Sequence, residues 1–480
     1  MFNTEPRFEY NFIKMNKNRL NLFITTQFIF LIGFNYYANA QTISAGFNHS
    51  LFSCGSGLPQ SVGSNTSGQL GLGNYVSHSA PVQVSGVSSI IAVDASYSHS
   101  LFLKNDGTVW AVGSNGQGQL GDGTTTSKII PVQVLGLTGI TAISASIDFS
   151  VFLKNDGTVW AVGNNIGGQL GDGTTVGKST PVQVIGLTGI TAISSGLYHS
   201  LFLKNDGTVW GTGGNNYGQI GNQPLFGVST PVQITGLDSI TKIAAGGTHS
   251  LFLKNDQTVW GVGSNYYGQL GNSNVGNDVF NPFQIIGLSQ MINISAGYLH
   301  SLYLKNNGTV WASGSNTYGQ LGDNSTIDKS IPFVIPGLNG IIAIDAGIYF
   351  SLFLKNDTTI KSVGNNNSGQ LSDGTTIERH TPVSVNGACS VTLEIQENYI
   401  KNTVSVYPNP CHEMLFIEFA DIYTDYTNMT AEIFNLQGQL LQTLILTGNT
   451  NIRINNLKNG IYLVHIKSPK GIKLEKIIKN

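Results

Sequence analysis

A unit of about 50 residues recurs seven times along the middle of this chain. Residues 99–110 return almost unchanged at 199–210, 249–260 and 300–311. A Gly-Gln-Leu-Gly mark or a close variant labels every unit, and its glutamine recurs at intervals of 50 or 51 residues, at Gln69, Gln119, Gln169, Gln219, Gln269, Gln320 and Gln370. Because each unit is too short to bury a core of its own, the units must pack against one another.

Each unit has the pattern of four short strands. In the third unit, β-branched and aromatic residues favour strands over residues 140–146, 150–154, 158–162 and 181–184. An Asn-Asp-Gly turn between the second and third of these strands predicts a tight hairpin, because Asp and Gly tolerate positive φ. Four-stranded sheets repeating at nearly constant length predict an all-β fold, a seven-bladed β-propeller in which each sheet covers its neighbour. A solenoid is the alternative.

The charge balance limits the partners. Charged residues make up 10% of the chain, and the formal net charge is -2. Nucleic acids and anionic membrane surfaces are bound through concentrated positive charge, so this composition argues against both. We expect a monomer that uses no cofactor.

The first 40 residues predict a signal peptide. An apolar run over residues 20–34 follows a short basic segment, and small residues at 38–40 suit cleavage between Ala40 and Gln41. The natural start is expected at Met15, because this start places the basic segment at the N-terminus. The run is too short and too polar for a spanning helix, which needs about 20 apolar residues.

Three marks in the units resemble the repeats of the regulator of chromosome condensation family. They are Gly-x-x-His-Ser, Asp-Gly-x-Val-Trp and Asn-x-x-Gly-Gln-Leu-Gly. The resemblance covers about residues 42–388 and implies a propeller, which we expect over residues 41–389. The name-giving members exchange guanine nucleotide on a small GTPase with the help of a protruding wedge. The near-constant unit length leaves no room for such an insertion, so we expect no small GTPase as a partner.

Antiparallel strands place two turns of each unit, Gly-x-x-His and Asn-x-x-Gly-Gln, on one face of the propeller. The inserted x-x residues vary between units while their surroundings repeat. They include eight of the 18 tyrosines: Tyr97, Tyr198, Tyr217, Tyr266, Tyr267, Tyr298, Tyr318 and Tyr349. Tyrosine gives a large contact area at low entropic cost. This rim is therefore the candidate binding surface, with aromatic packing between turns as the alternative.

A histidine follows the first turn of five units, at His49, His99, His199, His249 and His300. Phe149 and Phe350 fill the equivalent places in two other units. Metal ligands must converge and Phe cannot ligate, so we predict no metal site and a structural hydrogen-bonding role for these histidines.

Two cysteines lie at the ends of the repeat array. Cys54 replaces the hairpin lysine of the first unit, and Cys389 follows the last strand of the seventh. Both would lie on one face of adjoining blades. In an oxidising compartment they could form a ring-closing disulfide, or they could remain two free thiols.

The repeat marks end before residue 390, and a second domain is expected over residues 403–480 after a linker at 390–402. Its alternating strand patterns predict a small β-sandwich. Its marks are Tyr407, Pro408, Asn409, Pro410, Gly460 and Tyr462. In this order and at the chain's end, they closely resemble the C-terminal sorting domain of the type IX secretion system of the Bacteroidetes. The resemblance implies passage across both membranes, secretion or surface attachment, and the secretion machinery as a partner. An ordinary binding module is the alternative.

Three functions fit these features. Non-catalytic binding of a protein or glycan outside the cell is the leading hypothesis, because no Ser, His and acid arrangement stands outside the repeat. A secreted inhibitor of another enzyme is the second, since a bacterial β-lactamase inhibitor protein shares this repeat family. A polysaccharide-active enzyme is the third, and it would need close carboxylates.

The candidate carboxylates are Asp94, Asp148 and Asp345, which depart from the repeat. Asp94 and Asp345 share one position of their units and Asp148 occupies another, so we do not expect them to converge. We therefore predict that the protein is not an enzyme.

Overall fold

The computed structural model describes residues 42–221, 226–389, 404–419, 429–435, 440–468 and 471–480. The predicted signal peptide with Ala40 and Gln41, and almost all of the predicted linker, lie outside these residues. The chain divides into two compact units at Cys389. Within the described ranges no helix is long and apolar enough to cross a membrane.

The first unit is a ring of seven four-stranded antiparallel sheets, and each sheet is built from consecutive strands. Blades 1 to 4 comprise β1 (Thr42–Ala45), β2 (His49–Ser53), β3 (Pro59–Gly63), β4 (His78–Gln83); β5 (Ile90–Ala95), β6 (His99–Lys104), β7 (Val109–Gly113), β8 (Lys128–Gln133); β9 (Ile140–Ala145), β10 (Phe149–Lys154), β11 (Val159–Gly163), β12 (Lys178–Gln183); and β13 (Ile190–Ser195), β14 (His199–Lys204), β15 (Val209–Gly213), β16 (Val228–Gln233).

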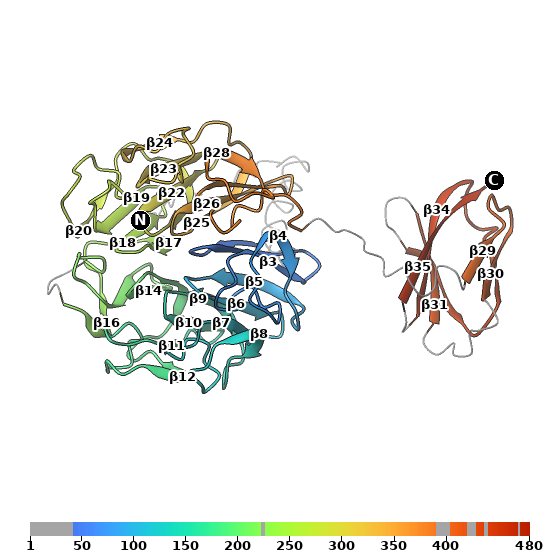
Figure 1. The fold of residues 1–480 in the computed structure, drawn as a ribbon, viewed down its shortest axis with the longest axis horizontal. Coiled ribbons are helices and arrows are strands. Elements are labelled where there is room, and N and C mark those ends of the chain that lie inside the picture. Colours follow the sequence, from blue (N-terminus) through green and yellow to red (C-terminus); the bar gives the residue numbers. More distant parts are fainter. Residues whose placement is uncertain (1–41, 222–225, 390–403, 420–428, 436–439, 469–470) are drawn as a thin grey trace, which may run out of the picture. The chain divides into compact units, whose positions relative to one another are not determined.

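Blades 5 to 7 comprise β17 (Ile240–Ala245), β18 (His249–Lys254), β19 (Val259–Gly263), β20 (Val279–Gln284); β21 (Met291–Ala296), β22 (His300–Lys305), β23 (Val310–Gly314), β24 (Lys329–Val334); and β25 (Ile341–Ala346), β26 (Phe350–Lys355), β27 (Ile360–Gly364), β28 (Arg379–Ser384). Figure 1 shows the blades side by side around a centre, with the first blade (blue) beside the last (orange). The predicted all-β propeller is confirmed.

Apolar layers between neighbouring sheets hold the ring together. Between blades 2 and 3, Leu101 and Val109 of one sheet pack with Phe152 and Val162 of the next, and Trp160 covers the edge of this layer. The same arrangement recurs around the ring, and burial of one such side chain contributes roughly 1.5–3 kcal/mol. The recurring tryptophans are therefore packing residues of the blade interfaces.

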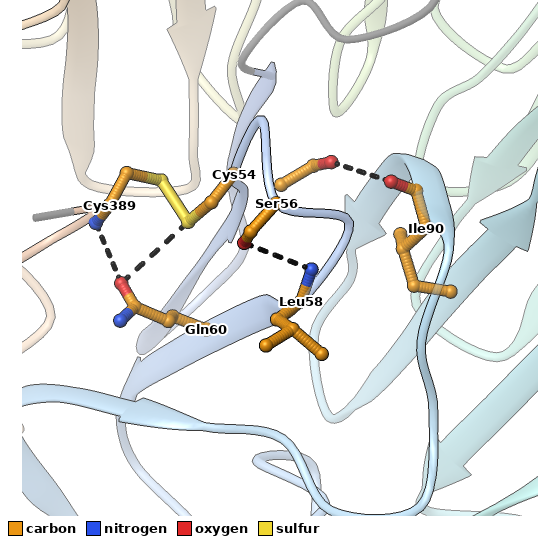
Figure 2. The surroundings of a disulfide bond; sticks show 7 residues. Cys54, Ser56, Leu58, Gln60, Ile90 and Cys389 are labelled. Atoms are coloured by element: carbon orange, nitrogen blue, oxygen red, sulfur yellow. Dashed lines mark hydrogen bonds between the residues drawn. A yellow bond between two sulfur atoms is a disulfide. The ribbon is translucent and has the colours of Figure 1, made fainter. Parts of the chain in front are cut away.

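The ring closes without exchange of strands between the first and last blades. Phe52 and Val62 of blade 1 share an apolar cluster with Leu352 of blade 7. On the hairpin face, a disulfide joins Cys54 to Cys389, with the two Cα atoms 5.1 Å apart (Figure 2). Gln60, which stands where five other blades carry Trp, accepts a hydrogen bond from the Cys389 N–H at 2.7 Å.

The second unit consists of two sheets around one apolar core. One sheet has the order β29 (Val404–Tyr407), β30 (Met414–Phe419), β33 (Thr450–Arg453), and the other has the order β32 (Leu440–Leu446), β31 (Met429–Asn435), β34 (Gly460–Ser468), β35 (Gly471–Lys479). Leu415 and Ile417 from the first sheet are buried with Ile433 and Val464 from the second. This arrangement is the small β-sandwich that the sequence predicts.

The Tyr-Pro-Asn-Pro mark fastens the final strand to this sandwich. The Asn409 side chain donates to the Lys476 carbonyl at 2.7 Å and accepts from the Ile478 N–H at 2.9 Å. The Tyr407 hydroxyl donates to the Glu418 carboxylate at 3.1 Å. Near the start of β34, the Tyr462 hydroxyl donates to the Lys458 carbonyl at 2.6 Å.

Candidate binding site at the channel mouth

The first strands of the seven blades line a central channel, and the Gly-x-x-His turns surround one end of it, which we call the mouth. Backbone hydrogen bonds link these turns around the ring. The Phe47 N–H donates to the Ser96 carbonyl at 3.0 Å, and across the ring closure the Ile348 N–H donates to the Gly46 carbonyl at 3.1 Å. The mouth is therefore held by neighbouring blades and is rigid.

The Asn-x-x-Gly-Gln turns are built by the two side chains that repeat. In blade 5, the Asn265 side-chain oxygen accepts from the Leu270 N–H at 2.9 Å, and that of Gln269 accepts from the Tyr267 N–H at 3.0 Å. Both amides are buried, whereas the inserted residues reach the surface. The invariant residues thus hold the turn and leave the variable ones for contact with other molecules.

Five aromatic rings form a continuous arc across blades 6, 7, 1 and 2. Tyr318 lies 4.8 Å from Tyr349 between ring centroids, Tyr349 lies 6.1 Å from Tyr298, and Phe47 lies 5.8 Å from Tyr349. Phe47 then stacks on Tyr97 at 4.2 Å. We call Phe47, Tyr97, Tyr298, Tyr318 and Tyr349 the aromatic arc; such contacts fix the orientation of the rings.

The remaining predicted tyrosines stand around the rest of the mouth. Tyr198, Tyr217 and Tyr267 lie close enough to Tyr298 to raise the pKa of its hydroxyl, after the larger effect of burial. Tyr266 contacts Tyr267 at 5.1 Å and is the most exposed of the eight, at 64%. The structure therefore gathers all eight on one face.

A hollow of about 100 Å³ lies inside the mouth. Tyr97, Tyr298, Ile147, Leu197 and Ile348 line it, and a ring of alanines and one serine, at positions 45, 95, 145, 195, 245, 296 and 346, forms its floor. The same ring also borders a second, polar hollow deeper in the channel.

Asp94 and Asp345 line the deeper hollow together, so the expectation that the three acids would not converge was wrong for this pair. They occupy the same position on the innermost strands of blades 2 and 7, and equal positions on innermost strands meet at the axis of a closed ring. Asp148 does not join them: it lies on a mouth turn, 3.5 Å from the Gln119 side-chain nitrogen.

The two aspartates act as acceptors in a belt of hydrogen bonds around the channel. Asp94 accepts from the Ala145 N–H at 2.6 Å and from the Ser44 hydroxyl at 2.9 Å. Asp345 accepts from the Ala45 N–H at 2.7 Å and from the Ser295 hydroxyl at 3.1 Å. Serines fill the equivalent place in other blades and accept from the next blade in the same way: Ser44, Ser144, Ser194 and Ser295.

Burial makes both carboxyl groups weaker acids than an exposed aspartate. It raises the pKa of Asp94 to about 7, and the hydrogen bond from Ala145 offsets part of this rise while the charge of Asp345 adds to it. Burial likewise raises the pKa of Asp345 to about 6, with the Ala45 N–H acting against it. Near neutral pH the pair therefore shares its remaining protons.

The five histidines are buried links between blades, which confirms their predicted hydrogen-bonding role. The His199 Nε2 lies 3.0 Å from the Ser250 hydroxyl, and this hydroxyl donates to the Gln219 carbonyl at 2.6 Å. Since the serine proton is used there, the histidine must donate from Nε2. Burial lowers the pKa of all five to about 3, so they are neutral.

The family model of the RCC1-like domain matches residues 61–406. The chain belongs to this family. Several solved structures share its fold. Human WBSCR16 has 23% identity and a TM-score of 0.61 over 67% of this chain and 92% of that one. Yeast RCC1 (Prp20) bound to Kap60 follows at 19% identity, with a TM-score of 0.63 over 77% of this chain and 86% of that one.

Prp20p of Saccharomyces cerevisiae, studied for its binding to Gsp1p and histones, shows 20% identity and a TM-score of 0.62 over 78% of this chain and 90% of that one. These identities show the propeller fold of this RCC1-like protein and no more. No curated protein matches the chain.

The model of the secretion system C-terminal sorting domain matches residues 405–480. This tail directs the RCC1-like propeller through type IX secretion to the cell surface or the medium, and it implies contact with the secretion machinery.

Sequence reasoning missed Phe47, which joins Tyr97 to Tyr349 and makes the arc continuous. Phe47 occupies the same turn position as Tyr97 and Tyr298, so the aromatic character of this position, rather than tyrosine alone, is the signal that indicates it. The apolar Ile147, Leu197 and Ile348 could have been found in the same way.

Proposed function

We propose that this protein is an exported, non-catalytic propeller that binds a protein or glycan at the channel mouth, at the cell surface or in the medium. The observation that carries the proposal is the group of eight tyrosines on the mouth face, held by turns that hydrogen-bond to neighbouring blades. No hydrogen bond joins any of their hydroxyls to a protein group within the described residues. Large, fixed rings with free polar ends suit contact with another molecule.

A non-catalytic role agrees with how the acids are used. Asp94 and Asp345 both have both carboxylate oxygens in hydrogen bonds that join blades. Serine side chains accept the equivalent hydrogen bonds in other blades, so the two acids have a structural role in joining the blades. Asp148 stands apart from them on the mouth face.

We do not propose small GTPases or nucleic acids as partners. The blades differ in length by one residue at most between successive glutamines, and the net charge of -2 offers no basic surface. We propose that the chain reaches its partner as a monomer after removal of residues 1–40.

The test compares the two faces of the propeller. Full-length protein would be titrated with protein and carbohydrate fractions of the host's culture medium, as wild type, as Tyr198→Ala/Tyr217→Ala, and as Leu135→Ala/Ile286→Ala. Leu135 and Ile286 are exposed and follow the fourth strands, away from the mouth. The mouth variant should lose about tenfold or more in affinity, as interface aromatics do, and the control should lose none. Equal affinity of the two variants would overturn the proposal.

A further inference from the structure

The mouth is almost free of charge. Its fourteen turns insert two residues each, and only Asp148 among these 28 is charged. An anionic ligand would require Arg or Lys to pair with it, and the inserted residues include neither. A cationic ligand would find one carboxylate on the turns, already near Gln119. The chemistry of the mouth therefore selects a neutral ligand.

Besides the amides and aliphatic hydroxyls of its turns, the mouth offers phenol hydroxyls. Burial raises the pKa of Tyr298 and Tyr349, and neighbouring tyrosines raise it further, so these hydroxyls stay protonated and can both donate and accept. They lie beside apolar ring faces on the same residues. A ligand that matches this pattern alternates apolar faces with many hydroxyl groups along its edges.

The shape of the mouth indicates a small, narrow ligand. The hollow of about 100 Å³ is smaller than the roughly 300–1,000 Å³ that is usual for small-molecule sites, so only the end of a ligand fits inside it. Tyr97 and Tyr298 of the aromatic arc form part of its wall, and Tyr349 and Phe47 continue the arc between them. A chain could lie along the arc with one end in the hollow.

We propose that the aromatic arc and the hollow bind the end of a neutral polysaccharide chain. The C–H face of a sugar ring would stack on the aromatic rings, and its hydroxyls would exchange hydrogen bonds with Tyr97 and Tyr298. This inference rests on the proposed function of the mouth as a binding face and names the ligand class.

The test is calorimetric titration of the full-length protein with defined hexasaccharides. The neutral probes are cellohexaose, xylohexaose and mannohexaose, and the acidic probe is hexagalacturonic acid. Tyr97→Phe and Tyr298→Phe remove one hydroxyl each and keep the ring, and each should weaken binding of the responsive neutral probe about 2- to 10-fold. Phe47→Ala interrupts the arc and should weaken it at least fivefold. Tyr75→Phe is the matched control, because Tyr75 is exposed on the β3–β4 loop and neither lines the hollow nor belongs to the aromatic arc.

Three results would overturn the proposal. They are the absence of binding to every neutral probe, equal or tighter binding of the acidic probe, and unchanged affinity in all three mouth variants. If no hexasaccharide binds while Tyr198→Ala/Tyr217→Ala still loses affinity for a protein fraction, the glycan proposal fails and the proposed binding face stands.

Discussion

Reduction of the disulfide between Cys54 and Cys389 should lower the stability of the propeller, but the propeller should remain folded at temperatures below its unfolding midpoint. The two cysteines are 335 residues apart in sequence. In the chain-entropy model, closing such a loop restricts the unfolded chain by about 6 kcal/mol, whereas native disulfides typically contribute about 2–5 kcal/mol. For a propeller of this size, we expect the unfolding midpoint to fall by roughly 3–7 °C. The ring itself should persist, because Phe52 and Leu352 still share a core across the closure.

The assay is thermal unfolding of the full chain, followed by near-ultraviolet circular dichroism, in oxidising and reducing buffer. The double variant Cys54→Ser/Cys389→Ser is the control: it should melt like the reduced wild type and ignore the reductant. An unchanged unfolding midpoint on reduction of the wild type would refute the reasoning, because it would mean that the disulfide does not restrict the conformational entropy of the unfolded chain.

Two further predictions follow from the channel and the tail. The folded pKa values of Asp94 and Asp345 lie above the usual unfolded value, so the unfolded state loses these protons first. The free energy of unfolding should therefore fall by roughly 5–7 kcal/mol as the pH rises from about 4 to about 7. Asp94→Ser, which copies other blades, should flatten this fall in urea titrations across that range; an identical slope would contradict the assignment. Asn409→Ala removes both side-chain hydrogen bonds to the final strand, so it should destabilise the tail domain by about 1–2 kcal/mol. It should also reduce the fraction of the protein that is secreted, as measured by immunoblot. Full secretion together with an unchanged melting temperature would contradict this prediction.

The propeller was predictable because its unit repeats with so little change. The observed strands of blade 3 differ from the expected ones by a residue or two, except that β12 begins at Lys178, before the expected residue 181. That strand starts with Lys-Ser-Thr, which carries weak strand preference, and it pairs irregularly with β11 around Gly163. Pairing with a neighbour extended it beyond what its own residues indicate.

The candidate site was predictable only in part. Turn position alone placed Tyr97 and Tyr298 on one face, because the direction of antiparallel strands follows from their order. The convergence of Asp94 and Asp345 required knowing which strand of a blade is innermost, and no local pattern supplies that. Ring contacts such as Phe47 with Tyr349 join blades 1 and 7, which are farthest apart in the sequence.

Because every blade is one uninterrupted stretch of chain, the repeat is also a unit that can be copied whole. A duplicated 50-residue segment would arrive with its hairpins, its mouth turns and its packing tryptophan, and with histidine and serine placed to bond the next blade. The near-identity of residues 99–110 and 199–210 is what such copying leaves behind. The inserted pairs could then diverge one blade at a time, so the mouth can acquire a new ligand while the ring beneath it stays the same.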